Sequence, residues 1–376
     1  MPKANILFQI NQEVSFSELT SIAVLRQVCQ AFLSFAPQPS GHPTPGNPPD
    51  CEFGTAHPLP QRHSPSLEDP CYTRPLDRPG EGEWKSTVHS LTKDQLQAIT
   101  SRAGEEPVIS EMSGVTSSDL YLLEYPDHRE VLRIFRAERW ETPAAVLSER
   151  ELQILRALVA TAIPTPAPIT TFMANGVLMS WLPGMIRLPS QPRSAWLARL
   201  ARTLAAIHAS TVKVPYVYES WNDTRADEPP FWWRDAGLWV EAQARSADRP
   251  AFAPNFLHRD YHPVNVLWKD GLISGVVDWI NACMGPIGVD VAHCRGNLAV
   301  MYGLETADAF LAAYQDESPT YQHDPYWDLD DALSAMPNVD VYPPWKEFGL
   351  TGLTTGLVRQ RLIAFIEAAE RQRPPR

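Results

Sequence analysis

The chain has 376 residues, 44% of them apolar and 20% charged, so it can form two or three folding units with buried cores. A small fold held together by disulfide bonds is thereby excluded. Acidic residues outnumber basic ones by 44 to 32, and the formal net charge of −12 argues against a nucleic acid or an anionic membrane surface as a partner. A neutral or cationic partner is favoured.

The cysteines and the hydropathy pattern indicate a reducing compartment. Five cysteines form no CxxC pair, and their odd number argues against a closed disulfide framework. The most apolar early stretch, residues 21–36, is interrupted by charged and amide side chains and lacks the layout of a signal peptide. No stretch approaches the ~20 consecutive apolar residues that span a membrane. We therefore expect a cytoplasmic protein with no membrane partner.

The first quarter of the chain is predicted to lie outside the main fold. Residues 1–36 are expected to be an N-terminal extension, in which apolar residues at helical spacing favour a short amphipathic helix. Residues 37–87 are predicted to be a disordered, proline-rich linker, because 12 prolines fall between positions 37 and 80 among Gly, Ser, His and Asn.

Residues 88–184 are predicted to form a small lobe built on an antiparallel sheet. A capped helix is expected over residues 90–103, which begin with Ser. Residues 108–135 alternate turn residues with strand-like runs. Residues 146–158 place Val146 and several leucines near one helical face, three prolines then end that helix, and a further strand is expected over residues 176–184.

Residues 185–376 are predicted to form a larger, mostly helical lobe. Its first helix, over residues 194–210, places Leu197, Leu200, Leu204 and Ile207 on one face. A sheet-rich lobe followed by a helical lobe is an α+β organisation.

The stretch that carries the chemistry runs from residue 256 to residue 295. It contains Asp260, then Asn265 five residues later, then Asp278. In phosphoryl transfer from a nucleotide, a carboxylate accepts the proton of the attacking hydroxyl, and oxygen ligands hold magnesium against the phosphates. These three residues have the side chains that such a site needs.

A hairpin between Asn265 and Asp278 is predicted from two short apolar runs separated by Asp270 and Gly271. It would bring Asn265 and Asp278 to the same end of two adjacent strands. Both side chains could then face one metal ion.

The segments "LHRDYHPVNVLW", "GVVDW" and "GPIGVDVAH" resemble the aminoglycoside phosphotransferase and choline kinase-like family. The resemblance covers roughly residues 108–300 and implies a bilobal protein kinase-like fold, with ATP or GTP as phosphate donor and Mg²⁺ as cofactor. It implies that Asp260 is the catalytic base and that Asn265 and Asp278 are magnesium ligands. His258 and Asp290 look structural, with Asp290 bracing the catalytic loop.

The resemblance extends to a cation and an acid in the small lobe. In the family, a strand cation is positioned over the nucleotide phosphates by a helix acid, which implies Arg133 and Glu151 here. Glu149 is a competing partner if the helix register differs. A surface strand cation and a solvated helix acid are the alternative.

Two segments of the small lobe are expected to contact the nucleotide. Ser113, Gly114 and Ser117 lie where a phosphate-covering loop is expected, although this chain lacks the second Gly and the Asn that the family more often has. The segment joining the lobes would meet adenine with backbone groups from Ser180 to Leu182. A plain turn and an ordinary buried strand are the alternatives.

The sequence says less about the acceptor site than about the residues for phosphoryl transfer. Nine acids and no Lys or Arg fall between residues 296 and 345, which in a cleft would attract an aminated substrate but which is also typical of a solvated face. Trp232, Trp233 and Trp239 could stack on a sugar or cover a cation, or they could belong to the core. The expected acceptor is a small hydroxylated molecule, neutral or cationic.

Three functions compete. The first is a kinase of a small hydroxylated molecule. The second is a catalytically inactive, kinase-like module that binds a nucleotide or another protein, which the atypical loop at Gly114 favours. The third is a protein kinase, suggested by the HRD triplet but disfavoured by Pro263, Trp279 and Ile280 and by the lack of an APE-like segment.

Overall fold

A computed structural model describes residues 91–112, 118–137, 140, 142–222, 229–335 and 339–372. Residues from Leu91 onward belong to one compact unit. The predicted extension over residues 1–36 and the predicted linker over residues 37–87 lie outside the described residues.

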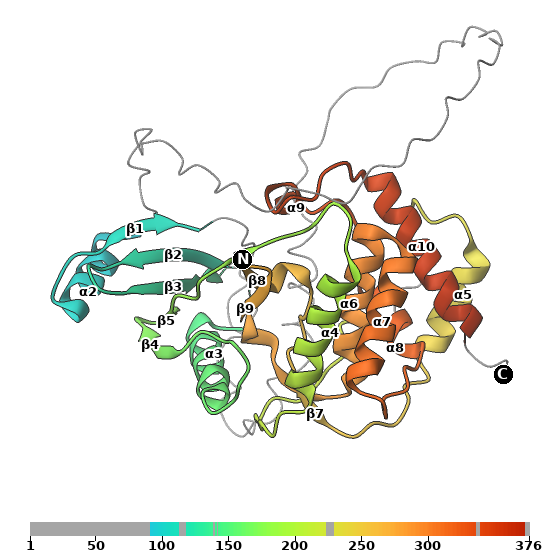
Figure 1. Ribbon diagram of the computed structural model, residues 1–376, viewed down its shortest axis with the longest axis horizontal. Helices are drawn as coiled ribbons and strands as arrows, with labels where there is room; N and C mark the ends of the chain where they lie inside the picture. The colour runs from blue at the N-terminus through green and yellow to red at the C-terminus, as the bar shows by residue number, and fades with distance from the viewer. Residues whose placement is uncertain are drawn as a thin grey trace, which may run out of the picture. The chain divides into compact units, whose positions relative to one another are not determined.

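The first part of the described chain is a five-stranded antiparallel sheet in the order β1-β2-β3-β5-β4 (Figure 1). The strands are β1 (Val108–Glu111), β2 (Ser118–Glu124), β3 (Arg129–Phe135), β4 (Pro168–Phe172) and β5 (Gly176–Ser180). Leu123, Leu132 and Leu178 on these strands are buried and form one small core with Ile99 of the preceding helix. The antiparallel sheet expected in this lobe is confirmed.

Helix α2 (Lys93–Ala103) begins three residues after Ser90. Its N-cap is Thr92, whose side chain accepts the amide of Gln95 while the Gln95 side chain accepts the amide of Thr92. This reciprocal pair satisfies two amides that the first turn leaves without helical partners.

Helix α3 (Ala144–Leu158) packs against β4 and β5 and carries Glu151 on its buried face. Leu147, Leu152, Leu155 and Leu158 are buried as the periodicity predicted. Val146 does not share that face: it is 55% exposed, because the neighbouring position at Leu147 is the one that points inward.

The remainder is mostly helical and contains two small sheets. The helices are α4 (Ser194–His208), α5 (Ala236–Ser246), α6 (Ile287–Tyr302), α7 (Leu304–Glu317), α8 (Tyr326–Ala335), α9 (Pro344–Glu347) and α10 (Thr355–Gln372). The short strands are β6 (Met185–Ile186), β7 (Asn255–Leu257), β8 (Val266–Lys269), β9 (Leu272–Val276) and β10 (Cys283–Gly285). Helices α4, α6 and α7 lie side by side, and α8 and α10 pack on α6 (Figure 1).

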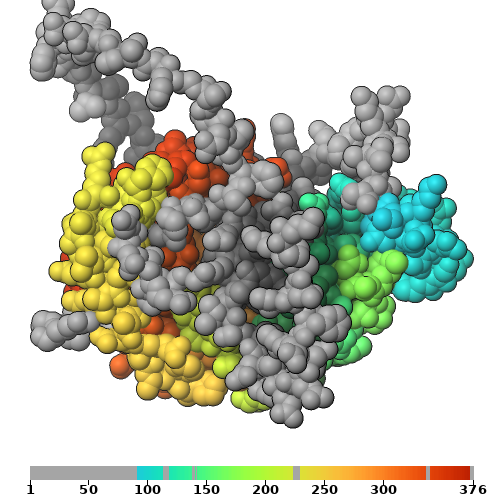
Figure 2. Space-filling view, turned by 180° about the vertical axis from the view of Figure 1, so that it is seen from behind, coloured from blue at the N-terminus to red at the C-terminus, as the bar shows by residue number. Residues whose placement is uncertain are grey.

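These elements form the expected α+β fold, with a small sheet-rich lobe followed by a larger helical part. In the space-filling view, the sheet lobe and the segment around α5 lie on opposite sides of the visible face (Figure 2). The exact lobe boundary between residues 184 and 185 stays a prediction. Within the described ranges, no helix combines the length and the apolar composition needed to cross a lipid bilayer.

Candidate active site

The loop after β7 is held by a buried carboxylate. Asp290 of α6 accepts the backbone amide of His258 at 2.8 Å and that of Arg259 at 2.7 Å. These two bonds hold Arg259 in a left-handed conformation, with φ of 72°, which is uncommon for a residue other than glycine. The Arg259 guanidinium also stacks on the Trp221 ring at 3.6 Å. Asp290 therefore makes the contacts expected of a residue that braces the loop.

His258 joins the same loop to the strand that follows it. Its Nε2 donates to the carbonyl of Val277 at 3.0 Å, and its Nδ1 accepts the amide of Asp260 at 3.3 Å. Burial lowers the pKa of this imidazole, which favours the neutral ring that these two contacts require. A structural function for His258 fits these contacts.

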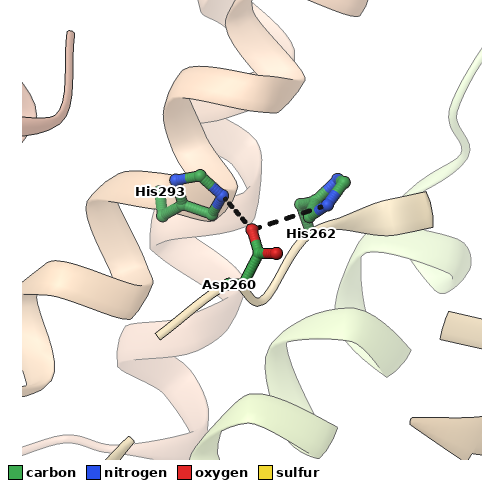
Figure 3. Close-up of side chains that lie close together, drawn as sticks. All are labelled: Asp260, His262 and His293. Carbon is green, nitrogen blue, oxygen red and sulfur yellow. Dashed lines mark hydrogen bonds and ion pairs between the residues drawn. The ribbon is translucent and has the colours of Figure 1, made fainter. Parts of the chain in front are cut away.

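Asp260 is buried at the end of this loop and faces two imidazoles (Figure 3). Its Oδ1 lies 3.0 Å from Nε2 of His293 and 3.8 Å from Nε2 of His262. Burial raises the pKa of the Asp260 carboxyl, but the hydrogen bond from His293 and the electrostatic interaction with the neighbouring imidazoles lower it overall. Asp260 is therefore ionised near neutral pH and able to accept a proton.

The sequence did not single out His293. It lies one helical turn after Asp290 on α6, and its Nδ1 lies 2.8 Å from Asp331 of α8. Both ring nitrogens thus face carboxylate oxygens, which requires an N–H on each nitrogen. Burial lowers the pKa of His293, but the charge of Asp331 and the bond to Asp260 outweigh this and raise it to about 10. The spacing of Asp290 and His293 on one helix face was the available signal.

His262 differs from His293 in its ionisation. It is buried, and burial lowers its pKa to about 4, so the ring is neutral near pH 7. A neutral imidazole, His262, and a protonated one, His293, thus lie beside Asp260.

The predicted hairpin is present and joins Asn265 to Asp278. Strands β8 and β9 pair with Val266 opposite Val276, and the amide of Val277 donates to the carbonyl of Asn265 at 3.0 Å. The turn residues Asp270 and Gly271 both have positive φ, as a tight hairpin turn requires. Asn265 and Asp278 therefore lie at the same end of the two strands.

Asn265 also connects the hairpin to the loop. Its Nδ2 donates to the backbone carbonyl of Asp260 at 2.8 Å. Burial raises the pKa of Tyr342, and the charges of Asp278 and Asp260 raise it further. The loop that carries Asp260 and the hairpin that joins Asn265 to Asp278 are thus directly connected.

Arg133 of β3 pairs with acids from two other elements. Its Nη1 lies 2.8 Å from Oε1 of Glu151 and 2.7 Å from Oδ1 of Asp278, and its Nε donates to Ser118 at 2.9 Å. Burial lowers the pKa of Arg133, but the charges of Asp278 and Glu151 raise it overall. The competing partner, Glu149, instead lies 3.8 Å from Arg156 on the exposed side of α3.

The structure describes one of the two segments that are expected to contact the nucleotide. Ser113, Gly114 and Ser117 lie outside the described residues. Ser180 ends β5, where its amide donates to Ala167 and its hydroxyl accepts the Ala167 amide. Leu182 follows β5 and contacts the hairpin near Gly275.

A cavity of about 110 Å³ opens beside Asp260. It is lined by His262 and His293, by the acids Asp331 and Asp340, and by aromatic side chains. The aromatic residues are Trp221, Tyr342 and Trp345.

The tryptophans named from the sequence do not line this cavity. Trp233 and Trp239 are buried, and half-buried Trp232 packs against the same large core. The core alternative is therefore correct for these three residues.

Most of the acidic run is used within the fold. Asp308 and Asp328 pair with Arg295, and Asp330 accepts hydrogen bonds from the Tyr218 and Ser220 hydroxyls. Asp331 and Asp340 line the cavity, so these two acids of the run could contact a substrate there.

Two sets of side chains offer ligands for a cation. Asn265 and Asp278 supply amide and carboxylate oxygens, which are the donors that Mg²⁺ prefers. Asp260, His262 and His293 supply one oxygen and two ring nitrogens, all within 4.8 Å of one another.

Comparisons with known proteins show similarity in sequence and in fold. A homoserine kinase from Mesorhizobium japonicum is 26% identical over 183 residues, which are 43% of this chain and 52% of the relative. The match thus spans about half of the length of that relative.

Two solved structures share the fold. The crystal structure of aminoglycoside phosphotransferase APH(4)-Ia aligns with a TM-score of 0.50 at 16% identity, over 74% of this chain and 99% of that one. A thermostable mutant of that enzyme, in a ternary complex with AMP-PNP and hygromycin B, aligns with the same score, identity and coverage. A sequence profile described as the phosphotransferase enzyme family, APH, matches residues 108–326. Because that match covers more than half of the chain, the protein belongs to the phosphotransferase enzyme family.

Proposed function

We propose that the chain transfers the terminal phosphoryl group of ATP to a hydroxyl of a small molecule. The observation that carries this proposal is the position of Asp260. Its ionised carboxylate lines a cavity. The backbone carbonyl of Asp260 accepts a hydrogen bond from Asn265, which lies at the start of the hairpin that leads to Asp278. Membership of the phosphotransferase family supports the same reaction class.

Asp260 acts as the base in this proposal. The acceptor hydroxyl lies in the cavity, and its proton passes to the Asp260 carboxylate as its oxygen attacks the phosphorus atom. A positioned base of this kind accelerates a reaction by roughly 100- to 10,000-fold. Asp290 and His258 keep the loop in the conformation that presents this carboxylate.

The residues present fit a nucleotide and a magnesium ion. Asn265 and Asp278 would hold Mg²⁺, which when bound neutralises negative charge on the phosphate oxygens. Arg133, aligned by Glu151, adds a fixed positive charge on the side of the sheet lobe. ATP is favoured as donor, because the related structure with hygromycin B holds AMP-PNP.

Further nucleotide contacts follow from the family pattern. Adenine would meet the segment from Ser180 to Leu182. The amides of Ser180 and Trp181 already donate to Ala167 and Arg129, so we assign this contact to the backbone of Leu182. Ser113, Gly114 and Ser117 would cover the phosphates.

The cavity favours a small acceptor that carries both a hydroxyl and an amine. Asp260, Asp331 and Asp340 bring three carboxylates to it, against one imidazolium at His293. The excess negative charge attracts a cation, and the aromatic side chains of Trp221, Tyr342 and Trp345 line the same cavity.

The test is a screen for ADP release in the presence of Mg²⁺ and ATP. The panel contains homoserine, hygromycin B, simple amino alcohols and neutral sugars of similar size, and the Asp260→Asn protein is the blank. We expect an amine-bearing alcohol to stimulate ADP release by the wild-type protein, and Asp260→Asn to abolish most of it while still binding nucleotide. Full kcat in the Asp260→Asn variant would refute the assignment of the base. Nucleotide binding without ADP release for any acceptor would favour the inactive, kinase-like module instead.

A further inference from the structure

Two imidazoles converge on Asp260, one of the three carboxylates that line the acceptor cavity. Asp260 and His262 come from the loop after β7, and His293 comes from α6. Figure 3 shows both rings turned toward Asp260, and the potential ligand atoms of the three side chains lie within 4.8 Å of one another. Phosphoryl transfer as proposed above uses the carboxylate but needs neither ring as a ligand.

We propose that Asp260, His262 and His293 form a binding site for a transition-metal dication, with Zn²⁺ as the reference ion. The side chains of this site differ from the oxygen ligands Asn265 and Asp278. Two imidazoles and a carboxylate are donors that Zn²⁺ accepts, whereas Mg²⁺ prefers oxygen ligands throughout.

The distances fit such an ion with small adjustments. Ligand atoms around a tetrahedral zinc ion lie roughly 3.3 Å apart, because bonds of about 2.0–2.1 Å meet at tetrahedral angles. The distances from Asp260 Oδ1 to Nε2 of His293 and of His262, 3.0 and 3.8 Å, bracket that value. The two rings are perpendicular, with centroids 5.6 Å apart, so they can approach one ion from different directions.

A carboxylate behind His293 supports a ligand role for this ring. Nδ1 of His293 lies 2.8 Å from Asp331, so the ring is oriented with Nε2 toward Asp260. Histidine ligands of metals usually donate their second ring N–H to such a group, which fixes the tautomer and strengthens the metal bond. Asp331 would therefore act as a positioning residue for the ion.

The cavity leaves room for a further ligand. All three side chains line it, so three protein ligands leave one coordination position accessible to water or to the acceptor. On binding, the ion replaces the proton that Nε2 of His293 donates to Asp260, and one proton leaves to solvent per ion.

A consequence for activity rests on the proposed function. An ion held on Asp260 occupies the oxygen that we propose as proton acceptor, so it competes with the acceptor and slows transfer. Binding itself does not depend on that function.

The test is Zn²⁺ titration by calorimetry of the full chain, freed of metal and without nucleotide, because ATP binds Zn²⁺ itself. Residues 1–90 contain further histidines and cysteines, so the diagnostic quantity is the difference between variants. The histidine variants are His262→Gln and His293→Gln, and the third variant is Asp331→Asn. His128→Gln is the matched control, since this exposed histidine contacts Asp127 and Glu130 of the sheet lobe.

We expect each cavity histidine variant to bind one equivalent of Zn²⁺ fewer than wild type or to bind it at least 100-fold more weakly. Asp331→Asn should keep the equivalent with a Kd roughly 10- to 100-fold higher, as for other residues that orient a metal ligand. His128→Gln should behave as wild type. Thermal melts check that each variant is folded. The three substitutions fall on different elements, so one local unfolding event would not explain a common loss of Zn²⁺ binding.

The proposal is overturned if wild type binds no Zn²⁺ in a saturable way, or if both cavity histidine variants keep the wild-type stoichiometry and Kd. Nucleotide and acceptor are absent from this titration. Failure of the proposed kinase reaction would therefore leave a positive result intact, and failure of the zinc site would leave the kinase proposal intact.

Discussion

Nη1 of Arg133 lies 2.7 Å from Oδ1 of Asp278, although 145 positions separate the two residues in the chain. The same nitrogen lies 2.8 Å from Glu151. Strand β3 of the sheet lobe is thereby connected to the end of the hairpin that carries Asn265. The side chains of Arg133 and Glu151 are buried, whereas that of Asp278 is 28% exposed, so Asp278 is the member of the three that a ligand can reach.

Removing the cation from this group should destabilise the protein strongly. Arg133→Met leaves Glu151 buried without its positive partner, and breaking a buried ion pair from one side costs about 3–5 kcal/mol. Arg133→Lys keeps the charge but cannot contact three groups with one planar fork, so it should lose less. Urea unfolding measures the free energy of unfolding of both variants. Arg156→Met is the control, because its exposed pair with Glu149 should contribute about 0–1 kcal/mol, and an Arg133→Met loss no larger than that would contradict the argument.

Asn265 has two functions that one substitution separates. In Asn265→Asp the side chain keeps oxygen ligands for Mg²⁺ but loses the N–H that donates to the Asp260 carbonyl. We expect Mg²⁺-dependent nucleotide binding, measured by calorimetry with and without the ion, to persist, while kcat falls at least 10-fold because the loop is no longer held.

Asn265→Ala is the companion variant, since it removes both the oxygen and the N–H. It should lose the magnesium dependence of nucleotide binding as well. Equal nucleotide affinities of Asn265→Ala with and without Mg²⁺ are expected, and wild-type magnesium dependence in that variant would exclude Asn265 as a ligand.

Local signals in the sequence were sufficient for one half of the site. The hairpin between Asn265 and Asp278 was predictable because Asp270 and Gly271 tolerate positive φ and the flanking runs are short and apolar. The strand and helix that carry Arg133 and Glu151 were likewise readable from their patterns, and the family resemblance then supplied the pairing.

The other half depends on how helices pack, which spacing along the chain does not specify. His293 and Asp331 lie on α6 and α8, and their contact requires the close packing of these two helices. The partners of the acidic run could not be predicted for a similar reason. Arg295, which pairs with Asp308 and Asp328, lies directly before the run that begins at residue 296, so a count along the sequence missed the cation.

Acid should destabilise the protein through Asp290, which holds the loop after β7. Burial raises the pKa of this carboxyl, but the hydrogen bonds from His208 and from the backbone of His258 lower it overall. A carboxyl with a lowered folded-state pKa stabilises the fold fully above its unfolded pKa of about 3.9, and this contribution is lost as pH falls through the folded value. The free energy of unfolding, measured by urea at a series of pH values, should therefore decline below about pH 4.

Asp290→Asn isolates that contribution. Its amide cannot accept all the N–H groups that the carboxylate accepts, so we expect a loss of about 1.5–3 kcal/mol per charged hydrogen bond at neutral pH. The difference between wild type and variant should shrink as pH falls below 4. A difference that stays constant over that range would mean that the carboxylate charge is not the source of the stability.

The contact between α6 and α8 should be unusually sensitive to one added methyl group. A Cβ at Gly288 of α6 would lie 2.1 Å from Cδ1 of Trp327 on α8, one turn before Asp331, so the helices must separate. Overpacking of this kind typically destabilises by about 1–3 kcal/mol, and Gly288→Ala should lower Tm accordingly. Gly356→Ala in α10 is the matched control, because nothing lies within 4 Å of its Cβ position. There the added methyl should leave stability unchanged or raise it by up to about 1 kcal/mol through helix propensity. Equal Tm values for the two variants would show that α8 can shift at no cost, and the position of Asp331 against His293 would then not be set by this packing.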